Sequence, residues 1–143
     1  MDAGTHERTP NRTQLRTVAS ILADESWVTS IDVFPANRPD SLYCVLNQTY
    51  YPPTLIRSVS FEIQSYRNGD FHLTYLEDHH GEQWCCRWDR HESKTFTRDH
   101  FHRPPDAQHD DGVNRSYPTD LLSVLTDVVA PWIYTRIQDT WED

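Results

Sequence analysis

The sequence has little glycine, lysine and cysteine, and each shortage excludes a class of protein. Its four glycines form neither G-x-G-x-x-G nor G-x-x-x-x-G-K-[ST], so the usual phosphate cradles of nucleotide-binding proteins are missing. The three cysteines include no C-x-x-C pair, which argues against a zinc ribbon or a thioredoxin-like site and suits reduced thiols in a cytoplasm. No apolar run approaches the ~20 residues of a membrane span. We therefore expect a cytoplasmic protein with no membrane contact.

Charge is the most informative bulk property. The 13 basic residues face 22 acidic ones, for a net charge of -9, and Lys94 is the only lysine. A surface with much aspartate and almost no lysine is typical of proteins from salt-saturated cytoplasm, so the sequence predicts a halophilic archaeal source. An ordinary acidic protein that has lost its lysines is the alternative. Net charge bears on solubility and association, not on fold.

Apolar residues recur at helical spacing near both ends of the chain and in alternation between them. Helices are predicted over 12–25 and 119–138, and Pro131 is expected to kink the second near Asp127. Strands are predicted over about 27–35, 42–50, 55–66, 71–77 and 83–90. Residues 1–11 are expected to be disordered and 104–118 to form a surface loop. The prediction is one α+β domain over 1–143, with about five antiparallel strands and an N-terminal and a C-terminal helix packed on the sheet.

Residues 84–105 differ in composition from the acidic remainder. Between Cys85 and Arg103 five basic residues outnumber three acidic ones, which gives a local charge of +2, and three histidines lie there as well. A cationic, histidine-rich segment on an acidic protein indicates an anionic ligand. Charges that protect an edge strand from aggregation are the alternative interpretation, and both stay open.

Strand alternation sorts these side chains by face. Trp84, Cys86 and Trp88 are expected in the core. The residues expected on the opposite, solvent-facing side are Cys85, Arg87, Asp89 and His91. If 96–102 is also extended, His100 and His102 project to one side together. Arginine, aspartate and several histidines then converge on one patch.

Such a patch admits two chemistries. Near-neutral imidazoles transfer protons and arginine stabilises phosphate charge, which suits metal-free cleavage of RNA by its own 2′-hydroxyl. Alternatively, His100 and His102 with Asp89 or Asp99 hold a divalent metal that activates water. Because the spacing matches no diagnostic metal motif, we favour the first and predict no metal and no cofactor.

The run Arg87-Trp88-Asp89-Arg90-His91, followed by Phe96 and by His100-Phe101-His102, resembles the signature of the TumE-type toxin family of prokaryotic toxin–antitoxin modules. That family typically shows R-[YW]-D-N, a short insert with histidine, and a block that ends in histidine. Here Arg90 stands where asparagine is usual, and Thr97-Arg98-Asp99 replaces a block with proline. The resemblance covers most of the chain. It implies a site at Arg87, Asp89, His100 and His102, with His91 peripheral, and a small helix-turn-helix antitoxin as partner.

The hypothesis is a growth-inhibiting toxin that acts as a metal-independent endoribonuclease. His100 and His102 are the expected base and acid, and Asp89 orients one of them. The expected phosphate-binding residues are Arg87, Arg90 and Arg98, with His91 and Lys94 in secondary roles. A non-catalytic protein- or nucleic-acid-binding module that blocks a cellular target and a degenerate inactive relative are the alternatives. A homodimer and a toxin–antitoxin hetero-oligomer are both compatible with the sequence.

Overall fold

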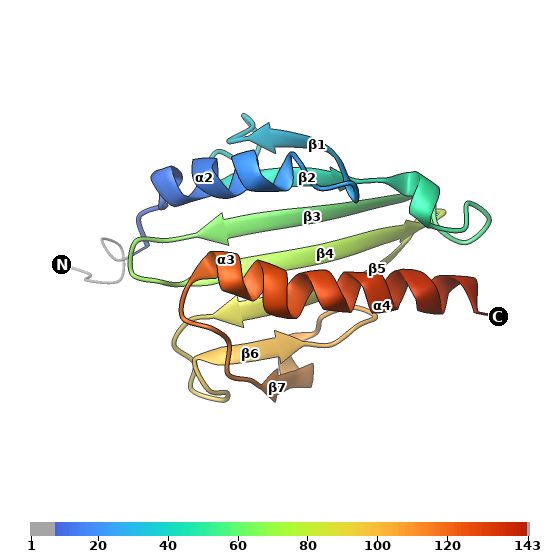
Figure 1. Cartoon of the computed structure of the whole chain (residues 1–143). Helices are drawn as coiled ribbons and strands as arrows, with labels where there is room; N and C mark the ends of the chain where they lie inside the picture. Colours follow the sequence, from blue (N-terminus) through green and yellow to red (C-terminus); the bar gives the residue numbers. More distant parts are fainter. Residues whose placement is uncertain (1–7, 143) are drawn as a thin grey trace.

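Over residues 8–142, which the computed structural model describes, the chain forms an α+β fold around one antiparallel sheet (Figure 1). The sheet has seven strands in the order β1 to β7, so each strand pairs with its neighbours in sequence. The strands are β1 (Val28–Val33), β2 (Ser41–Leu46), β3 (Ser58–Ser65), β4 (Phe71–His79), β5 (Glu82–Arg90), β6 (Asp99–His102) and β7 (Gly112–Asn114). Short 3-10 turns, η1 (Gln48–Tyr50) and η2 (His109–Asp111), lie in the connections.

Both predicted helices are present, and they lie on the same face of the sheet (Figure 1). Helix α2 spans Arg12–Leu22, and the C-terminal helix runs through α3 (Leu121–Val124), the π-helical turn η3 (Leu125–Val129) and α4 (Ala130–Trp141). The π-helical turn contains Asp127, where the kink is expected, and it ends two residues before Pro131, which has no N–H to continue the regular bonding pattern. None of the described helices is long and apolar enough to cross a membrane.

The prediction of about five strands is wrong, because β6 and β7 lie in segments without a clear apolar alternation. β6 has four residues, and β7 has three and falls inside the expected loop 104–118. Pairing with β5 defines β6, and pairing with β6 defines β7. Neither pairing can be read from the local sequence of the two strands. Within the expected disordered segment 1–11, residues 1–7 lie outside the described part. Pro10 forms a β-bridge to Tyr66, so the segment is ordered from there on.

The hydrophobic core lies between the sheet and the helices. As expected, alternate residues of β3, β4 and β5 fill it, with Phe61, Leu73 and Cys86 fully buried. Trp88 packs against Phe101 at 5.3 Å and against Trp132 of α4 at 5.2 Å between ring centroids. Burial of large side chains stabilises a fold by about 1.5–3 kcal/mol each. The core therefore fixes β4, β5 and β6 relative to one another, and with them the side chains on the other face.

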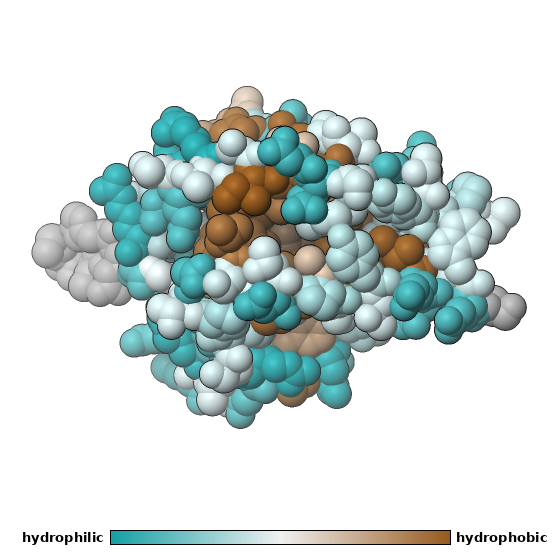
Figure 2. Space-filling model, viewed as in Figure 1, coloured by the Kyte–Doolittle hydropathy of each residue, from teal (hydrophilic) through white to brown (hydrophobic). Residues whose placement is uncertain are grey.

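The helical face also carries an apolar groove between α2 and the C-terminal helix (Figure 2). Its most exposed apolar side chains are Ile21 and Leu122, each 37% exposed, and Tyr134, 52% exposed. Glu25 lies at the same groove. The two faces of the sheet thus differ in chemistry, since the polar clusters of β5 and β6 lie on the side away from the helices.

Candidate active site around a buried aspartate

A row of polar side chains crosses β4, β5 and β6 on the face of the sheet that the helices leave open. The register pairs His72 with Asp89 and Asp89 with His100. Side chains at paired positions lie on the same face and are lateral neighbours. In the adjacent row Arg87 pairs with His102. Strand pairing alone therefore gathers three histidines and an arginine around one carboxylate.

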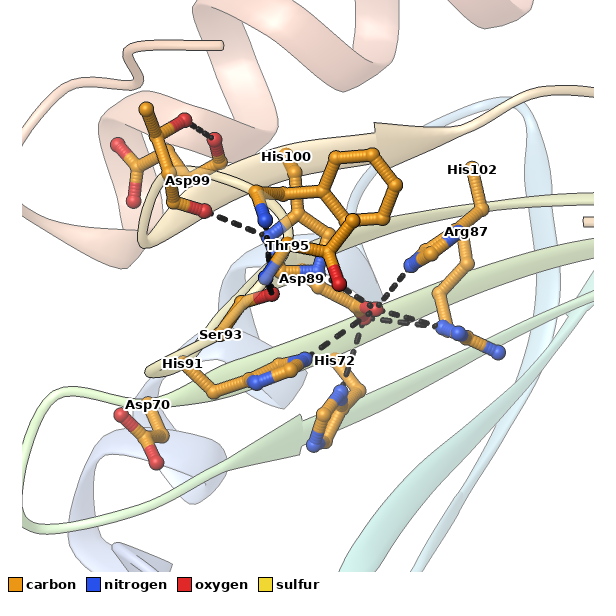
Figure 3. Close-up of polar contacts among 12 residues, drawn as sticks. Asp70, His72, Arg87, Asp89, His91, Ser93, Thr95, Asp99, His100 and His102 are labelled. Atoms are coloured by element: carbon orange, nitrogen blue, oxygen red, sulfur yellow. Dashed lines mark hydrogen bonds and ion pairs between the residues drawn. The ribbon is translucent and has the colours of Figure 1, made fainter. Parts of the chain in front are cut away.

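Asp89 is the centre of this cluster and is fully buried. Its Oδ1 lies 2.9 Å from Nδ1 of His72 (Figure 3). The Nε of Arg87 donates to both carboxylate oxygens, at 3.0 Å to Oδ1 and 2.9 Å to Oδ2. Burial alone raises the pKa of a carboxyl group, but the hydrogen bond from His72 and the charge of Arg87 lower the pKa of Asp89 to about 2. The cluster is thus built around a carboxylate that is ionised at neutral pH.

Three further histidines direct their Nε2 atoms at Oδ2 of Asp89 (Figure 3). The distances are 3.2 Å for His102, 3.6 Å for His100 and 3.8 Å for His91. Each of these rings places its Nδ1 against a backbone carbonyl oxygen, at 2.7–3.0 Å; the carbonyls are those of Glu92, Thr97 and Gln108. Because a carbonyl only accepts, Nδ1 carries the proton, and in the neutral ring Nε2 presents a lone pair. The backbone thus sets both the tautomer and the direction of each imidazole.

The chain between β5 and β6 covers the inner part of the cluster. Phe96 of this connection stacks on His100, with ring centroids 5.5 Å apart, and meets His102 edge-on at 6.0 Å. His100 and His102 are each only 1% exposed. The expectation of a solvent-facing patch is therefore wrong for Asp89, His100 and His102, because a tertiary contact of the connecting segment buries them.

The outer part of the cluster remains open to solvent. The side chains of His72, His91 and Arg87 are 19%, 27% and 32% exposed. Sequence reasoning assigned no role to His72. The predicted turn at 79–81 could have identified His72, because a tight antiparallel hairpin there places residue 72 opposite Asp89.

Two of the predicted phosphate-binding arginines lie outside the cluster. Arg90 donates to both oxygens of Asp99, at 2.6 and 3.0 Å, and to the carbonyls of Tyr117, Pro118 and Thr119. The guanidinium of Arg90 therefore connects β5 to the segment just before the C-terminal helix. Arg98 forms an ion pair with Asp70 at 2.8 Å. Together with Lys94 it lines an open hollow on the surface of the β5–β6 connection.

Two overlapping groups of side chains in the described chain have the composition and spacing to hold a metal ion. One consists of His72, Asp89 and His91, and the other of Asp89, His100 and His102. In each group the ligand atoms lie within 4.8 Å of one another. The arrangement is therefore suited both to proton transfer by imidazoles and to metal binding.

The fold and the cluster define a small α+β protein with histidines and an arginine gathered around a buried carboxylate on the open face of its sheet. Comparison with known families identifies it further: the model of the family described as "Toxin TumE" matches residues 18–137. The chain therefore belongs to the TumE toxin family, whose members are toxins of toxin–antitoxin systems with an antitoxin as partner. The matched region contains every residue of the cluster. No curated protein and no solved structure matches the chain.

Proposed function

We propose that this toxin stops growth as a metal-independent ribonuclease whose active site is the Asp89 cluster. The observation that carries the proposal is the convergence of four imidazoles and one guanidinium on a single ionised carboxylate. Imidazoles supply proton donors and acceptors near neutral pH, and a guanidinium stabilises the charge on a phosphate in the transition state.

Arg87 is the residue best placed to bind the scissile phosphate. Its Nε holds Asp89, and its side chain is 32% exposed. Over residues 8–142 its terminal nitrogens take part in no other hydrogen bond or ion pair. A guanidinium oriented in this way offers two parallel donors to phosphate oxygens. Lys94 and Arg98, in the hollow beside the cluster, suit the flanking phosphates of the same strand.

His91 and His72 are the imidazoles that a substrate reaches, and their ring centroids lie 5.3 Å apart. In the proposed reaction His91 Nε2 removes the proton of the 2′-hydroxyl and the 2′-oxygen bonds to phosphorus. The bond from phosphorus to the 5′-oxygen then breaks, and His72, whose Nδ1 is held by Asp89, protonates the leaving oxygen through its Nε2. For this step the substrate has to displace the guanidinium of Arg8, which lies 2.9 Å from that Nε2. We assign the base and acid roles to His91 and His72 and not, as the sequence suggested, to His100 and His102. Burial under Phe96 keeps the inner histidines from substrate.

The test is cleavage of matched RNA and DNA oligonucleotides in the presence of a chelator. We expect RNA fragments that end in a 2′,3′-cyclic phosphate and intact DNA, because only RNA supplies the internal nucleophile. His72→Gln and His91→Gln should each lower the rate by about 10²–10⁴-fold, the usual contribution of a general acid or base. His80→Gln is the matched control, since His80 is exposed in the 79–81 turn and bonds to the carbonyl of Pro53.

Two results would overturn this proposal. Activity that disappears in chelator and returns with a divalent ion would exclude the metal-free mechanism. Growth arrest without RNA cleavage, in cells and with purified toxin, would favour a module that blocks its target by binding.

A further inference from the structure

We propose that Asp89, His100 and His102 form a binding site for one zinc-class transition-metal ion beneath Phe96. This goes beyond the ribonuclease proposal, and the binding itself does not depend on it. The three side chains are at most 1% exposed, and they come from the paired strands β5 and β6.

Two of the three distances between the candidate ligand atoms are close to those around a tetrahedral ion, and the third is at most 4.8 Å. Oδ2 of Asp89 lies 3.2 Å from Nε2 of His102 and 3.6 Å from Nε2 of His100. Zinc bonds of 2.0–2.1 Å at tetrahedral angles place neighbouring ligand atoms about 3.3 Å apart. Small side-chain rotations therefore suffice to bring these atoms onto one ion. A water or His91, whose Nε2 is 3.8 Å from the same oxygen, completes the coordination.

The ligands are already oriented by outer partners. Nδ1 of His100 and of His102 lies against a backbone carbonyl, which is the usual arrangement behind metal-binding histidines. On the other side of the carboxylate, His72 and Arg87 hold Asp89. Two nitrogen lone pairs then face one anionic oxygen. A divalent cation placed between these atoms relieves both repulsive contacts.

The donor set determines which ions fit. Two imidazoles and one carboxylate suit Zn²⁺, Co²⁺ and Ni²⁺, whereas Mg²⁺ prefers a shell of oxygens. The positive charge of Arg87, 2.9 Å from Oδ2, opposes the cation. We therefore expect an ion that exchanges with a chelator, because the hydrophobic core on the other face of the sheet maintains the fold without it.

Binding would also regulate the toxin. A divalent ion neutralises the carboxylate that orients His72 and Arg87, so the loaded protein should cleave RNA more slowly than the stripped protein. This consequence rests on the proposed function, whereas the existence of the site does not.

The full-length chain, stripped with chelator, is titrated with Zn²⁺ and with Co²⁺ by calorimetry. We expect one equivalent to bind and Mg²⁺ to give no signal. His100→Gln and His102→Gln should each weaken binding by more than the ~100-fold upper range of outer-partner substitutions. His80→Gln should leave the affinity unchanged. An affinity equal to that of the unsubstituted protein in both ligand variants, or loss of binding in Cys85→Ser, would overturn the proposal.

A second measurement uses the unsubstituted protein, since variants of buried histidines could lose their fold. In ¹⁵N spectra of the histidine rings, one equivalent of Zn²⁺ should shift Nε2 of His100 and His102 and leave their Nδ1 protonated. Chemical-shift changes confined to other histidines would overturn the proposed site. Zinc binding in a toxin that never cleaves RNA would reject only the ribonuclease. Cleavage that needs zinc would reject the metal-free step and the inhibition by the bound ion, but not the binding site.

Discussion

At the scale of single residues, the sheet carries a fully buried carboxylate on each face, and their surroundings differ. Glu77, on the core side, accepts two hydrogen bonds from Arg136 at 2.6 and 2.7 Å, and one from Tyr75 at 2.6 Å. His79 adds a contact at 2.7 Å. These partners surround the carboxylate and join α4 to β4. Asp89 instead faces imidazoles whose lone pairs point toward it, so Glu77 is suited to a structural role and Asp89 to a chemical one.

Removal of the partner of Glu77 should destabilise the fold strongly. Arg136→Met leaves a buried carboxylate without its cation, which typically costs about 3–5 kcal/mol. Urea unfolding measures this loss. The double variant with Glu77→Gln should regain part of it, because no unpaired charge then remains. A single variant as stable as the parent would show that the ion pair does not hold α4.

The same carboxylate should give the fold a defined acid response. Burial raises the pKa of Glu77, but the hydrogen bonds from Arg136 and Tyr75 outweigh it and leave the pKa below its usual value of 4.5. A depressed pKa stabilises the folded state above the pKa of the unfolded chain, and the stabilisation is lost as pH falls below about 4.5. The stability difference between the parent and Glu77→Gln should therefore shrink from pH 6 to pH 3 in urea titrations. A constant difference would contradict this.

At the scale of elements, the connection between β5 and β6 decides what reaches the inner histidines. Phe96 is its apolar contact with the cluster, and it rests on Gly112 at the start of β7. A Cβ on Gly112 would lie 2.6 Å from the ring of Phe96. The absence of a side chain at residue 112 is thus what allows Phe96 to close over His100 and His102.

Gly112→Ala should displace Phe96 and expose the inner histidines. The added methyl group overpacks the contact, at a typical cost of about 1–3 kcal/mol. Chemical modification of histidine, mapped by mass spectrometry, should become several-fold faster at His100 and His102, and Phe96→Ala should have the same effect. His80, already exposed, serves as the internal reference. Unchanged protection of both inner histidines would show that Phe96 is not their cover.

The sequence was sufficient to predict the long strands and the helices, but not the burial of the inner histidines. Half-buried strands alternate with a period of two, so β3, β4 and β5 could be read from residues such as Phe61 and Leu73. β6 offers one inward apolar residue, Phe101, which is too little for a pattern. Burial of His100 arises from a connection that folds back over the sheet, and no local signal encodes that contact. The same limit applies to Arg90, whose partners lie 9–29 residues away.

At the scale of the whole molecule, the two faces of the sheet carry different features. The helices and the apolar groove occupy one face, and the histidine cluster lies on the other. Only Arg87 among the predicted phosphate-binding arginines joins the cluster, and the molecule around it carries a net charge of -9. For the RNA substrate that we propose, long-range attraction is therefore weak, and binding would rely on close contacts such as those of the Arg87 guanidinium.

The excess of acidic charge should make folding depend on salt. Mutual repulsion weakens as ionic strength rises, because the screening length falls from about 10 Å at 0.1 M to about 3 Å at 1 M. We expect cooperative thermal unfolding, followed by far-UV dichroism, in molar salt and a lower midpoint or no transition in dilute buffer. Identical transitions in both would contradict the halophilic origin that we propose from the Asp-rich, Lys-poor surface.

The strict β1-to-β7 order has a consequence for synthesis on the ribosome. Each new strand pairs with the one made just before it, so the sheet can extend as the chain emerges, through contacts that are near in sequence. All residues of the cluster have been synthesised once the ribosome has passed His102, yet the second of the two helices on the core side begins only at Leu121. A nascent chain thus carries the side chains of the cluster before the core behind them is complete. The toxin should become competent only when its last helix docks, which leaves the producing cell an interval in which an antitoxin can meet it.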